Sequence, residues 1–511
     1  MTRNNLGELG KKAASNIAPT LLQILRRAFP LLALLCTACM VGPKYQRPDA
    51  PAPPAYKEPA PDNFKEISTW QPAQPNDGAI RGKWWEIFKD PQLNALEEQV
   101  DLSNQNILAA VAQYRAAREA IAIVRSGLFP TVTASPSILG TRPPANPTNS
   151  TIGNGSTGVR GDFTLPFEFS YVVDLWGSIR RSVTASAENA QVSAAELENA
   201  RLSYQAELAL AYFGLRGVDG DQELLESTVK SYEDFLKLTT DRFNSGVASG
   251  GDVAQAQTQL DAARAQLIDL GVARAQFEHA IATLMGKPPS ELSIPYQALK
   301  SQPPSIPVGV PSTLLERRPD IAAAERQMAS ANEQIGIAKA AYYPSLVLGA
   351  SAGFASSDIS TWFTWPSRFW SVGPQMVETI FEKGKRHAQV ELAQANYDST
   401  VAHYRQTVLT GFQQVEDNLA TLRILEKETG AETQAVNAAR ESLAISTSQY
   451  TGGTASYLQV IASQTIALQN ERTLVDIQTR RMLASVLLIQ ALGGGWDSSQ
   501  LPSTTDLVQG K

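Results

Sequence analysis

Proline is missing from two long stretches of this chain, and this feature restricts the fold more than any other. The first stretch lies between Pro166 and Pro288, and the second lies between Pro374 and Pro502. Both are rich in Ala, Gln, Glu, Leu and Arg, which favour helices, whereas a proline breaks a helix interior. Each stretch therefore predicts two long helices joined by one turn near the middle of the stretch.

The two stretches are copies of one sequence. The predicted turns, Phe243–Gly246 and Tyr450–Gly453, lie 207 positions apart, and each runs from an aromatic residue to a glycine. The same offset superimposes Gly177 on Gly384, Arg216 on Arg423, Ser249 on Ser456, and Gly286 on Gly493. Upstream the offset is 214 and superimposes Ile107 on Ile321, Glu119 on Glu333, and Phe129-Pro130 on Tyr343-Pro344. The chain is therefore an internal duplication, and its first copy carries seven extra residues within the loop-like segment 140–161.

Helices of this length cannot fold alone. A helix of about 60 residues is about 90 Å long, far longer than a compact domain is wide, so it needs neighbours along its whole length. A coiled-coil rod without a pore would account for the helices. It would leave the segments between them unexplained.

Those segments have the pattern of membrane strands. From Asp162 to Leu175, apolar side chains alternate with mostly polar ones, and the same period of two occurs after Pro130 and from Ser345 to Phe354. A fourth strand is expected at about Phe369–Val377, next to a loop rich in Trp and Phe. Lengths of about ten residues suit a tilted crossing of the bilayer, and aromatic rings prefer its boundaries. A soluble β-sandwich is the alternative for these strands.

Four strands are too few to close a barrel. An open sheet edge in lipid would leave backbone groups without hydrogen bonds, so the chain is expected to assemble with copies of itself. Two copies give eight strands and an interior filled by side chains, whereas three give twelve strands and room for a passage. A homotrimer is the simplest channel, although this reasoning leaves four copies open.

The N-terminus resembles an export signal. Basic residues precede an apolar run from Phe29 to Val41, which is too short to span a bilayer but suits a secretory signal. Small residues then precede Cys39, as in the lipobox of bacterial lipoproteins, although Cys36 stands where that motif usually has Leu. We expect residues 1–38 to be removed and Cys39 to carry a covalent lipid. The alternative is an ordinary signal peptide followed by a free cysteine.

Composition excludes several functions. The net charge is -6 and no basic tract stands out beyond the signal, so a nucleic-acid partner is not expected. Cys36 and Cys39 are the two cysteines, and the three histidines lack ligand-like spacing. We find no catalytic motif, metal-ligand set or phosphate-binding loop. The sequence therefore predicts neither an enzyme nor a cofactor apart from the lipid on Cys39.

Several motifs together resemble the TolC-type outer-membrane efflux channels, in the lipoprotein subgroup of multidrug efflux systems. The matching motifs are Cys39-Met40-Val41-Gly42-Pro43-Lys44-Tyr45 with Pro48; Trp84-Trp85 with Phe88, Asp90-Pro91 and Leu93; Asp174-Leu175-Trp176-Gly177 with Arg180; and Gly493-Gly494-Gly495-Trp496. The resemblance implies a mainly α fold in which a trimer forms a twelve-stranded β-barrel in the outer membrane and a helical α-barrel tunnel in the periplasm. It also implies a periplasmic adaptor protein and an inner-membrane pump as partners.

The resemblance and the duplication together divide the chain. We expect a signal peptide at 1–38, a lipid-anchored extended strap at 39–90, a first repeat at 91–287, a linker and equatorial belt at 288–318, a second repeat at 319–494, and a C-terminal tail at 495–511. Each repeat should contain a helix, two strands and a long helical hairpin. Trp84, Trp85 and Phe88 are interpreted as a packing cluster, with Asp90 capping the next helix and Pro91 in its first turn.

The hairpin tips are the candidate functional positions. By resemblance Gly246 and Gly453 contact the adaptor, and glycine also suits a left-handed turn there. Asp252 follows Ser249 as in a helix cap; if it instead faces the lumen, a trimer gathers three carboxylates that favour cations and make closure depend on pH. Gln459 stands at the same place in the second copy, so any acidic ring is weakened. Arg242 and Tyr450 are the candidates for links that hold the inner end shut.

The predicted function is a passive duct for small-molecule or drug export across the outer membrane. Two alternatives remain open at this stage. One is a coiled-coil lipoprotein that tethers envelope layers without a pore, and the other is a channel for protein secretion. The sequence does not identify the cargo.

Overall fold

The computed structural model describes residues 40–50, 52–59, 82–142, 158–299, 302–308, 311 and 314–509. The predicted signal peptide and Cys39 lie outside these ranges, as do parts of the predicted strap and of the insertion in the first repeat.

Both repeats contain the same succession of elements. The first repeat contains α3 (Gln105–Ser126), β1 (Thr131–Ala134), β2 (Ser137–Thr141), β3 (Arg160–Val173), α4 (Ser178–Asn244) and α5 (Gly250–Leu284). The second contains α7 (Pro319–Ala340), β4 (Ser345–Ser356), β5 (Arg368–Val377), α8 (Lys385–Thr451) and α9 (Tyr457–Ala491). The short elements are η3 (Trp84–Phe88), α2 (Pro91–Ser103), η4 (Pro289–Glu291), α6 (Leu314–Arg317), η6 (Ile359–Thr361), η7 (Trp365–Ser367), η8 (Ser498–Gln500) and α10 (Thr504–Gln509).

Helix lengths confirm the duplication. Helices α4 and α8 both have 67 residues, α5 and α9 both have 35, and α3 and α7 both have 22. The long helices begin at equivalent positions of the two repeats, because Gly177 and Gly384 are their N-cap residues, with φ of 78° and 82°. A left-handed backbone of this kind is easily adopted only by glycine.

The turns lie where they were predicted, but the arms of each hairpin are unequal. The turn was expected near the middle of each proline-free stretch, and this was wrong, because the two arms have 67 and 35 residues. The shorter arm ends where a separate helix, α3 or α7, continues it. At the junction of α5 and α3, Asn104 Nδ2 donates to the carbonyl of Leu284 at 2.7 Å, and Ser103 Oγ donates to that of Met285 at 2.6 Å. Arg318 Nη1 donates to the carbonyl of Ala491 at 3.0 Å in the corresponding place between α7 and α9.

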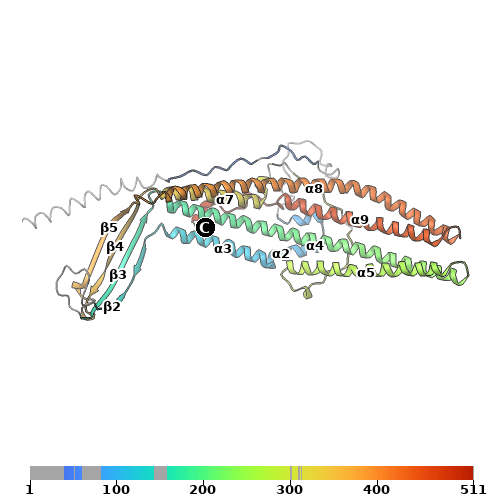
Figure 1. The fold of residues 1–511 in the computed structure, drawn as a ribbon, viewed down its shortest axis with the longest axis horizontal. Coiled ribbons are helices and arrows are strands. Elements are labelled where there is room, and N and C mark those ends of the chain that lie inside the picture. Colours follow the sequence, from blue (N-terminus) through green and yellow to red (C-terminus); the bar gives the residue numbers. More distant parts are fainter. Residues whose placement is uncertain are drawn as a thin grey trace, which may run out of the picture.

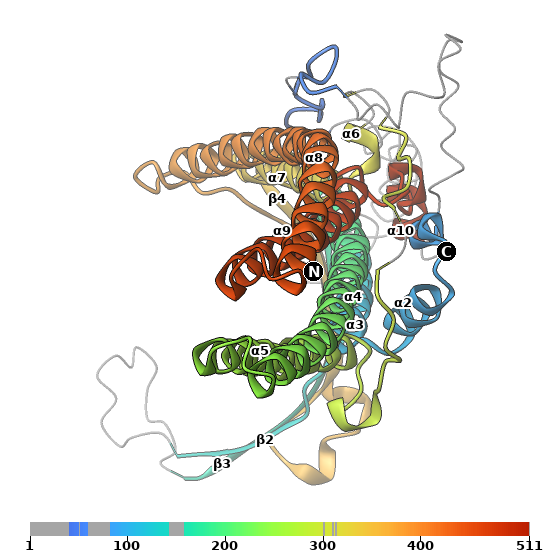
Figure 2. The same ribbon diagram turned by 90° about the vertical axis from the view of Figure 1, so that its right-hand side faces the viewer.

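The helices form a long curved layer with the sheet at one end. In Figure 1 the strands lie at one end of the molecule and the two hairpin tips lie at the other. Viewed along the helices in Figure 2, α5, α4, α9 and α8 follow an arc, and α2, α6 and α10 lie on its convex side. The molecule is therefore a segment of a tube wall, and none of the described helices lies on its concave face.

The described sheet has four strands, and a break divides the first of them. Its order is β1-β3-β4-β5, all antiparallel, and β2 also pairs with β3. Strands β1 and β2 keep one register against β3, since Ala134 pairs with Phe167 and Ser137 with Thr164. Pro136 lies between them and has no N–H to donate, so the single strand expected after Pro130 is interrupted there.

The register confirms that one face of the sheet is apolar. Directly opposed residues share a face, and Phe167 is opposite Ala352, which is opposite Trp370. Leu165 and Phe354 continue the same face. The other face carries Glu168 opposite Ser351 and Ser371, with glycines alongside. An apolar face against a polar face is the arrangement of a membrane barrel wall.

A buried cluster attaches η3 and α2 to the long helices. Trp84 and Trp85 are each 2% exposed, and Phe88 packs on Phe213 with ring centroids 4.9 Å apart. Asp90 caps α2 by accepting from the N–H groups of Gln92 and Leu93, as expected, and its carboxylate also accepts from Tyr212 Oη at 2.7 Å. These contacts attach α2 to the convex side of α4.

The linker after α5 is held by buried charges. Arg216 and Asp219 on α4 form an ion pair at 2.9 Å, and both side chains are almost completely buried. Arg216 also donates to the carbonyl of Pro295, and Asp219 accepts from the N–H of Gln297. Pairing each buried charge with several partners offsets its desolvation, and it fixes this part of the linker along the helices.

Candidate functional site

The two hairpin tips lie side by side at the end farthest from the sheet (Figure 1). Gly246 has φ of 76° and donates to the carbonyl of Phe243, and Gly453 has φ of 77° and donates to that of Tyr450. Both glycines are exposed, and a Cβ atom at either position would have no described atom beyond its own neighbours within 4 Å. The turn conformation therefore favours glycine, while the surface above each turn is open.

A small hydrophobic core joins the two tips. It consists of Ala256, Tyr450, Tyr457 and Val460, with Phe235, Leu236, Leu238, Leu443 and Ile461 packed against it. The rings of Tyr450 and Tyr457 are 5.4 Å apart between centroids. Burial, with smaller contributions from Tyr450, Tyr232 and Asp252, raises the pKa of Tyr457 to about 12, so its hydroxyl stays neutral at physiological pH.

Arg242 clamps the tip of the first hairpin onto the second. Its Nη1 donates to the carbonyl of Thr451 at 3.0 Å, and its guanidinium lies over the ring of Tyr450, 4.9 Å from the centroid. The contact combines a hydrogen bond to the last carbonyls of α8 with a cation–π interaction. Arg242 and Tyr450, the two candidates for closing links, are thus brought together, and the clamp lies within one chain.

The clamp has no counterpart in the other repeat. The offset of 207 places Gln449 at the position of Arg242, and Phe243 at that of Tyr450. Phe243 is 47% exposed, whereas Tyr450 is 4% exposed. In an assembly of several copies, the second hairpin of one chain would contact the first hairpin of the next. Gln449 and Phe243 cannot form the same link there, because Gln449 has no guanidinium and Phe243 is not a buried tyrosine.

Asp252 and Gln459 differ in what they do at the start of their helices. The Asp252 carboxylate accepts from the N–H of Ser249 at 3.0 Å, and the Asp252 N–H donates to Ser249 Oγ at 3.2 Å, which completes a capping box. Among the described residues, the Ser456 side chain caps no N–H group of α9, and Gln459 is exposed. The geometry thus shows the predicted capping role of Asp252 at α5 and no equivalent cap at the described start of α9.

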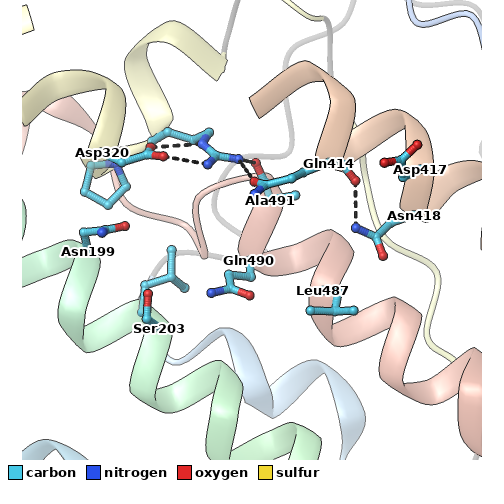
Figure 3. A pocket seen from close by; sticks show the side chains of 12 residues that line it. Asn199, Ser203, Asp320, Gln414, Asp417, Asn418, Leu487, Gln490 and Ala491 are labelled. Atoms are coloured by element: carbon cyan, nitrogen blue, oxygen red, sulfur yellow. Dashed lines mark hydrogen bonds and ion pairs between the residues drawn. The ribbon is translucent and has the colours of Figure 1, made fainter. Parts of the chain in front are cut away.

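A second candidate site was not found from the sequence. A polar cavity of about 400 Å³ opens beside the junction of α7 and α9. Figure 3 shows Asn199 and Ser203 of α4 on one side and Gln414, Asp417 and Asn418 of α8 on the other, with Gln490 of α9 between them. These residues come from elements far apart in sequence, so local patterns give no sign of the cavity.

Arg318 forms one wall of this cavity. Its guanidinium donates to both carboxylate oxygens of Asp320, at 3.0 and 2.7 Å, and to Gln414 Oε1 at 2.8 Å. The offset of 214 superimposes Arg318 on Asn104, and both side chains donate to a carbonyl at the end of the hairpin in their own repeat. That repeated position is the sequence signal that would have indicated the junction.

Within the described ranges, no group of three or more His, Cys, Asp or Glu is placed to hold a metal ion. None of the described helices combines the length and the apolar character needed to cross a membrane.

The fold and the apolar sheet face define a class of outer-membrane channel proteins. The structure superimposes on the outer-membrane channel OprN with a TM-score of 0.78 at 27% identity, over 90% of this chain and 100% of that one. The probable efflux pump outer membrane protein TtgC of Pseudomonas putida is 31% identical over 475 residues, which cover 91% of this chain and 96% of TtgC. Outer membrane protein OprJ of Pseudomonas aeruginosa is 30% identical, over 92% of this chain and 96% of OprJ.

A model of the family described as outer membrane efflux protein matches residues 96–287 and 310–494. The chain belongs to this family, and the two matched ranges each begin near the start of a repeat and end close to its last helix. It is therefore an outer-membrane efflux channel, as the sequence motifs predicted.

Proposed function

We propose that three copies of this chain form one continuous duct through the outer membrane and into the periplasm. The observation that carries this proposal is the described sheet, whose four strands leave β5 unpaired on one edge and β1 with β2 unpaired on the other. Edge strands in lipid need partners, and three such sheets close a barrel of twelve strands that is wide enough for a passage. The curved helical layer repeated three times continues that passage as a tunnel.

The duct is passive and exports small molecules. Its inward sheet face is polar and rich in glycine and serine, as at Gly349, Ser351 and Gly353, which gives little basis for selecting a cargo. The likeness to efflux pump proteins supports small-molecule export over protein secretion, and the channel class supports a protein that catalyses no reaction. An inner-membrane pump supplies the energy and the choice of cargo, through a periplasmic adaptor.

The adaptor docks at the hairpin tips. Gly246 and Gly453 are exposed, and nothing in the described chain covers the turns that they form. Because glycine has no side chain, another protein can approach the backbone closely at these turns, and any side chain there would obstruct it. The Arg242 clamp holds the closed end between dockings.

If Asp252 faces the lumen of the trimer, three carboxylates meet at its inner end and favour cations. The Asp252→Asn variant is therefore expected to have a lower cation preference, measured as the reversal potential in a salt gradient. An unchanged reversal potential would assign Asp252 to the helix cap alone.

Single-channel recording and mass measurement together test the proposal. The purified protein should show discrete conductance steps in planar bilayers, and its mass in mild detergent should be that of three chains. A tether without a pore would give no conductance steps. A folded monomer would contradict the assembly.

A further inference from the structure

The cavity beside Arg318 faces the concave side of the helical layer. Glu416 accepts hydrogen bonds from the N–H groups of Lys57 and Glu58, so its side of α8 is covered by the strap that follows the N-terminus. Gln414 and Asn418 lie two residues before and after Glu416, which is about 200° around a helix at 100° per residue. Gln414 and Asn418 therefore point away from the strap and, in the proposed trimer, into the tunnel. Asp417 is exposed and lies about 100° from Glu416, at the border of the same face.

Arg318 brings a positive charge to the cavity wall, but protein atoms engage it fully. Its guanidinium is held by Asp320, by Gln414 Oε1 and by the carbonyl of Ala491, all within 3.0 Å. The Arg318 side chain is 9% exposed, so it is not available to an incoming anion. The carboxylate of Asp320 therefore already neutralises the positive charge of Arg318 when no ligand is bound.

The rest of the cavity lining offers one carboxylate together with amide and hydroxyl groups that can both donate and accept. Asp417 is exposed, and its carboxylate receives one long bond of 3.4 Å, from Gln413 Nε2. The side chains of Asn199, Ser203 and Gln490 also line the space, and in the described part of the chain none of them makes a side-chain hydrogen bond. One unneutralised carboxylate and several amide and hydroxyl oxygens suit a ligand that brings positive charge and multiple N–H donors.

We propose that this cavity is a tunnel-lining site for small organic polycations, such as linear polyamines, with Asp417 as the charged contact. The inference rests on the proposed function, because the cavity faces a tunnel only in the trimer. Its volume of about 400 Å³ accommodates part of an extended amine chain beside Asp417, while Asn199 and Ser203 accept from further N–H groups. The site lies inside one chain, so a trimer carries three.

The repeat supplies a matched control. Glu207 on α4 occupies the position that corresponds to Gln414 on α8, and it is exposed. Leu210 on α4 corresponds to Asp417, so the equivalent place in the first repeat lacks the charged contact. Glu207→Gln removes one negative charge, as Asp417→Asn does, at a position that does not line the cavity.

The experiment is block of the single-channel current by spermidine in planar bilayers. The concentration for half-block should rise about tenfold in Asp417→Asn, as expected for loss of one charge-assisted contact, and stay within about twofold in Glu207→Gln. Ser203→Leu, which fills the cavity without changing charge, should weaken block as well.

Equal effects of Asp417→Asn and Glu207→Gln would overturn the site, because they would show a general effect of tunnel charge. Normal channels that spermidine does not block would overturn it too. A protein without any channel activity would instead contradict the proposed function, and the site would fall with it.

Discussion

A single buried carboxylate limits the stability of the packing between α2 and the long helices. Glu97 on α2 is 0% exposed, and neither of its side-chain oxygens has a hydrogen-bond partner among the described residues. Burial, and to a smaller extent the charge of Asp101, raises the pKa of Glu97 well above its usual value. Its ionised form is therefore disfavoured in the folded protein more than in the unfolded chain.

The pH dependence follows from the direction of that shift. The folded protein binds the Glu97 proton more tightly, so this residue causes stability to fall as pH rises above the unfolded pKa and through the folded one. Glu97→Gln should remove this dependence and raise the free energy of unfolding at pH 8 by roughly 1 kcal/mol or more. Thermal unfolding midpoints in detergent from pH 5 to 8 measure it.

The neighbouring residue is the control. Glu98 is half exposed and paired with Lys83, so Glu98→Gln should leave the pH profile close to that of the unchanged protein. A Glu97→Gln protein that keeps the full pH dependence would show that Glu97 is not its source.

At the scale of elements, the hairpin tips should tolerate substitution structurally but not functionally. Changing Gly246 and Gly453 to Asp costs about 1–2 kcal/mol at each turn, because both have positive φ. A Cβ atom added at either glycine has no described atom within 4 Å beyond its own neighbours, so the trimer should still form. They would obstruct the adaptor, and host cells should lose drug resistance.

Gly430→Asp provides the comparison for the tips. Gly430 lies inside α8 and has equally open surroundings, so the same change there tests exposed surface away from the tip. Its carriers should stay resistant. Full resistance in the double tip variant would remove the tips from the docking mechanism.

Closure of the inner end should depend on Arg242 of the first hairpin and not on the equivalent residue of the second hairpin. Arg242→Ala removes the hydrogen bond to Thr451 and the contact with the Tyr450 ring, so the closed end should open more often. Gln449→Ala, at the repeat-equivalent position, removes no clamp and should leave opening unchanged. Single-channel open probability is the measurement. Similar values for the Arg242→Ala and unchanged proteins would exclude Arg242 as a closing link.

At the scale of the molecule, sequence predicts repetition and periodicity better than contacts between repeats. The offset and the glycines at 177 and 384 located the long helices, and alternation located the strands. The stacking of α3 on the end of α5, and of α7 on the end of α9, was not predicted, because helix propensity does not indicate which helices pack end to end. The Arg242 clamp and the Arg318 cavity depend on how the hairpins curve around each other. Local sequence does not specify that geometry.

The last prediction concerns attachment of the whole molecule to the membrane. Residues directly after Cys39 are fixed where the sheet meets the helices: Val41 N–H donates to the carbonyl of Trp176, and Met40 packs on Gly177. A lipid on Cys39 would therefore start at the membrane boundary, one residue away from a rigid contact. Lipid adds to the hold of the barrel on the membrane without being needed for it.

Cys39→Ser should abolish incorporation of labelled palmitate, while the trimer and its conductance persist because the barrel itself spans the membrane. Cys36→Leu is the matched control, since it removes the cysteine that leaves with the signal peptide and supplies the residue usual at that position of the lipobox, so labelling should not fall. Label retained in the Cys39→Ser protein, or absent from both variants and the unchanged chain, would favour an ordinary signal peptide followed by a free cysteine. The fixed position of Met40 would then serve only to hold the strap against the helices.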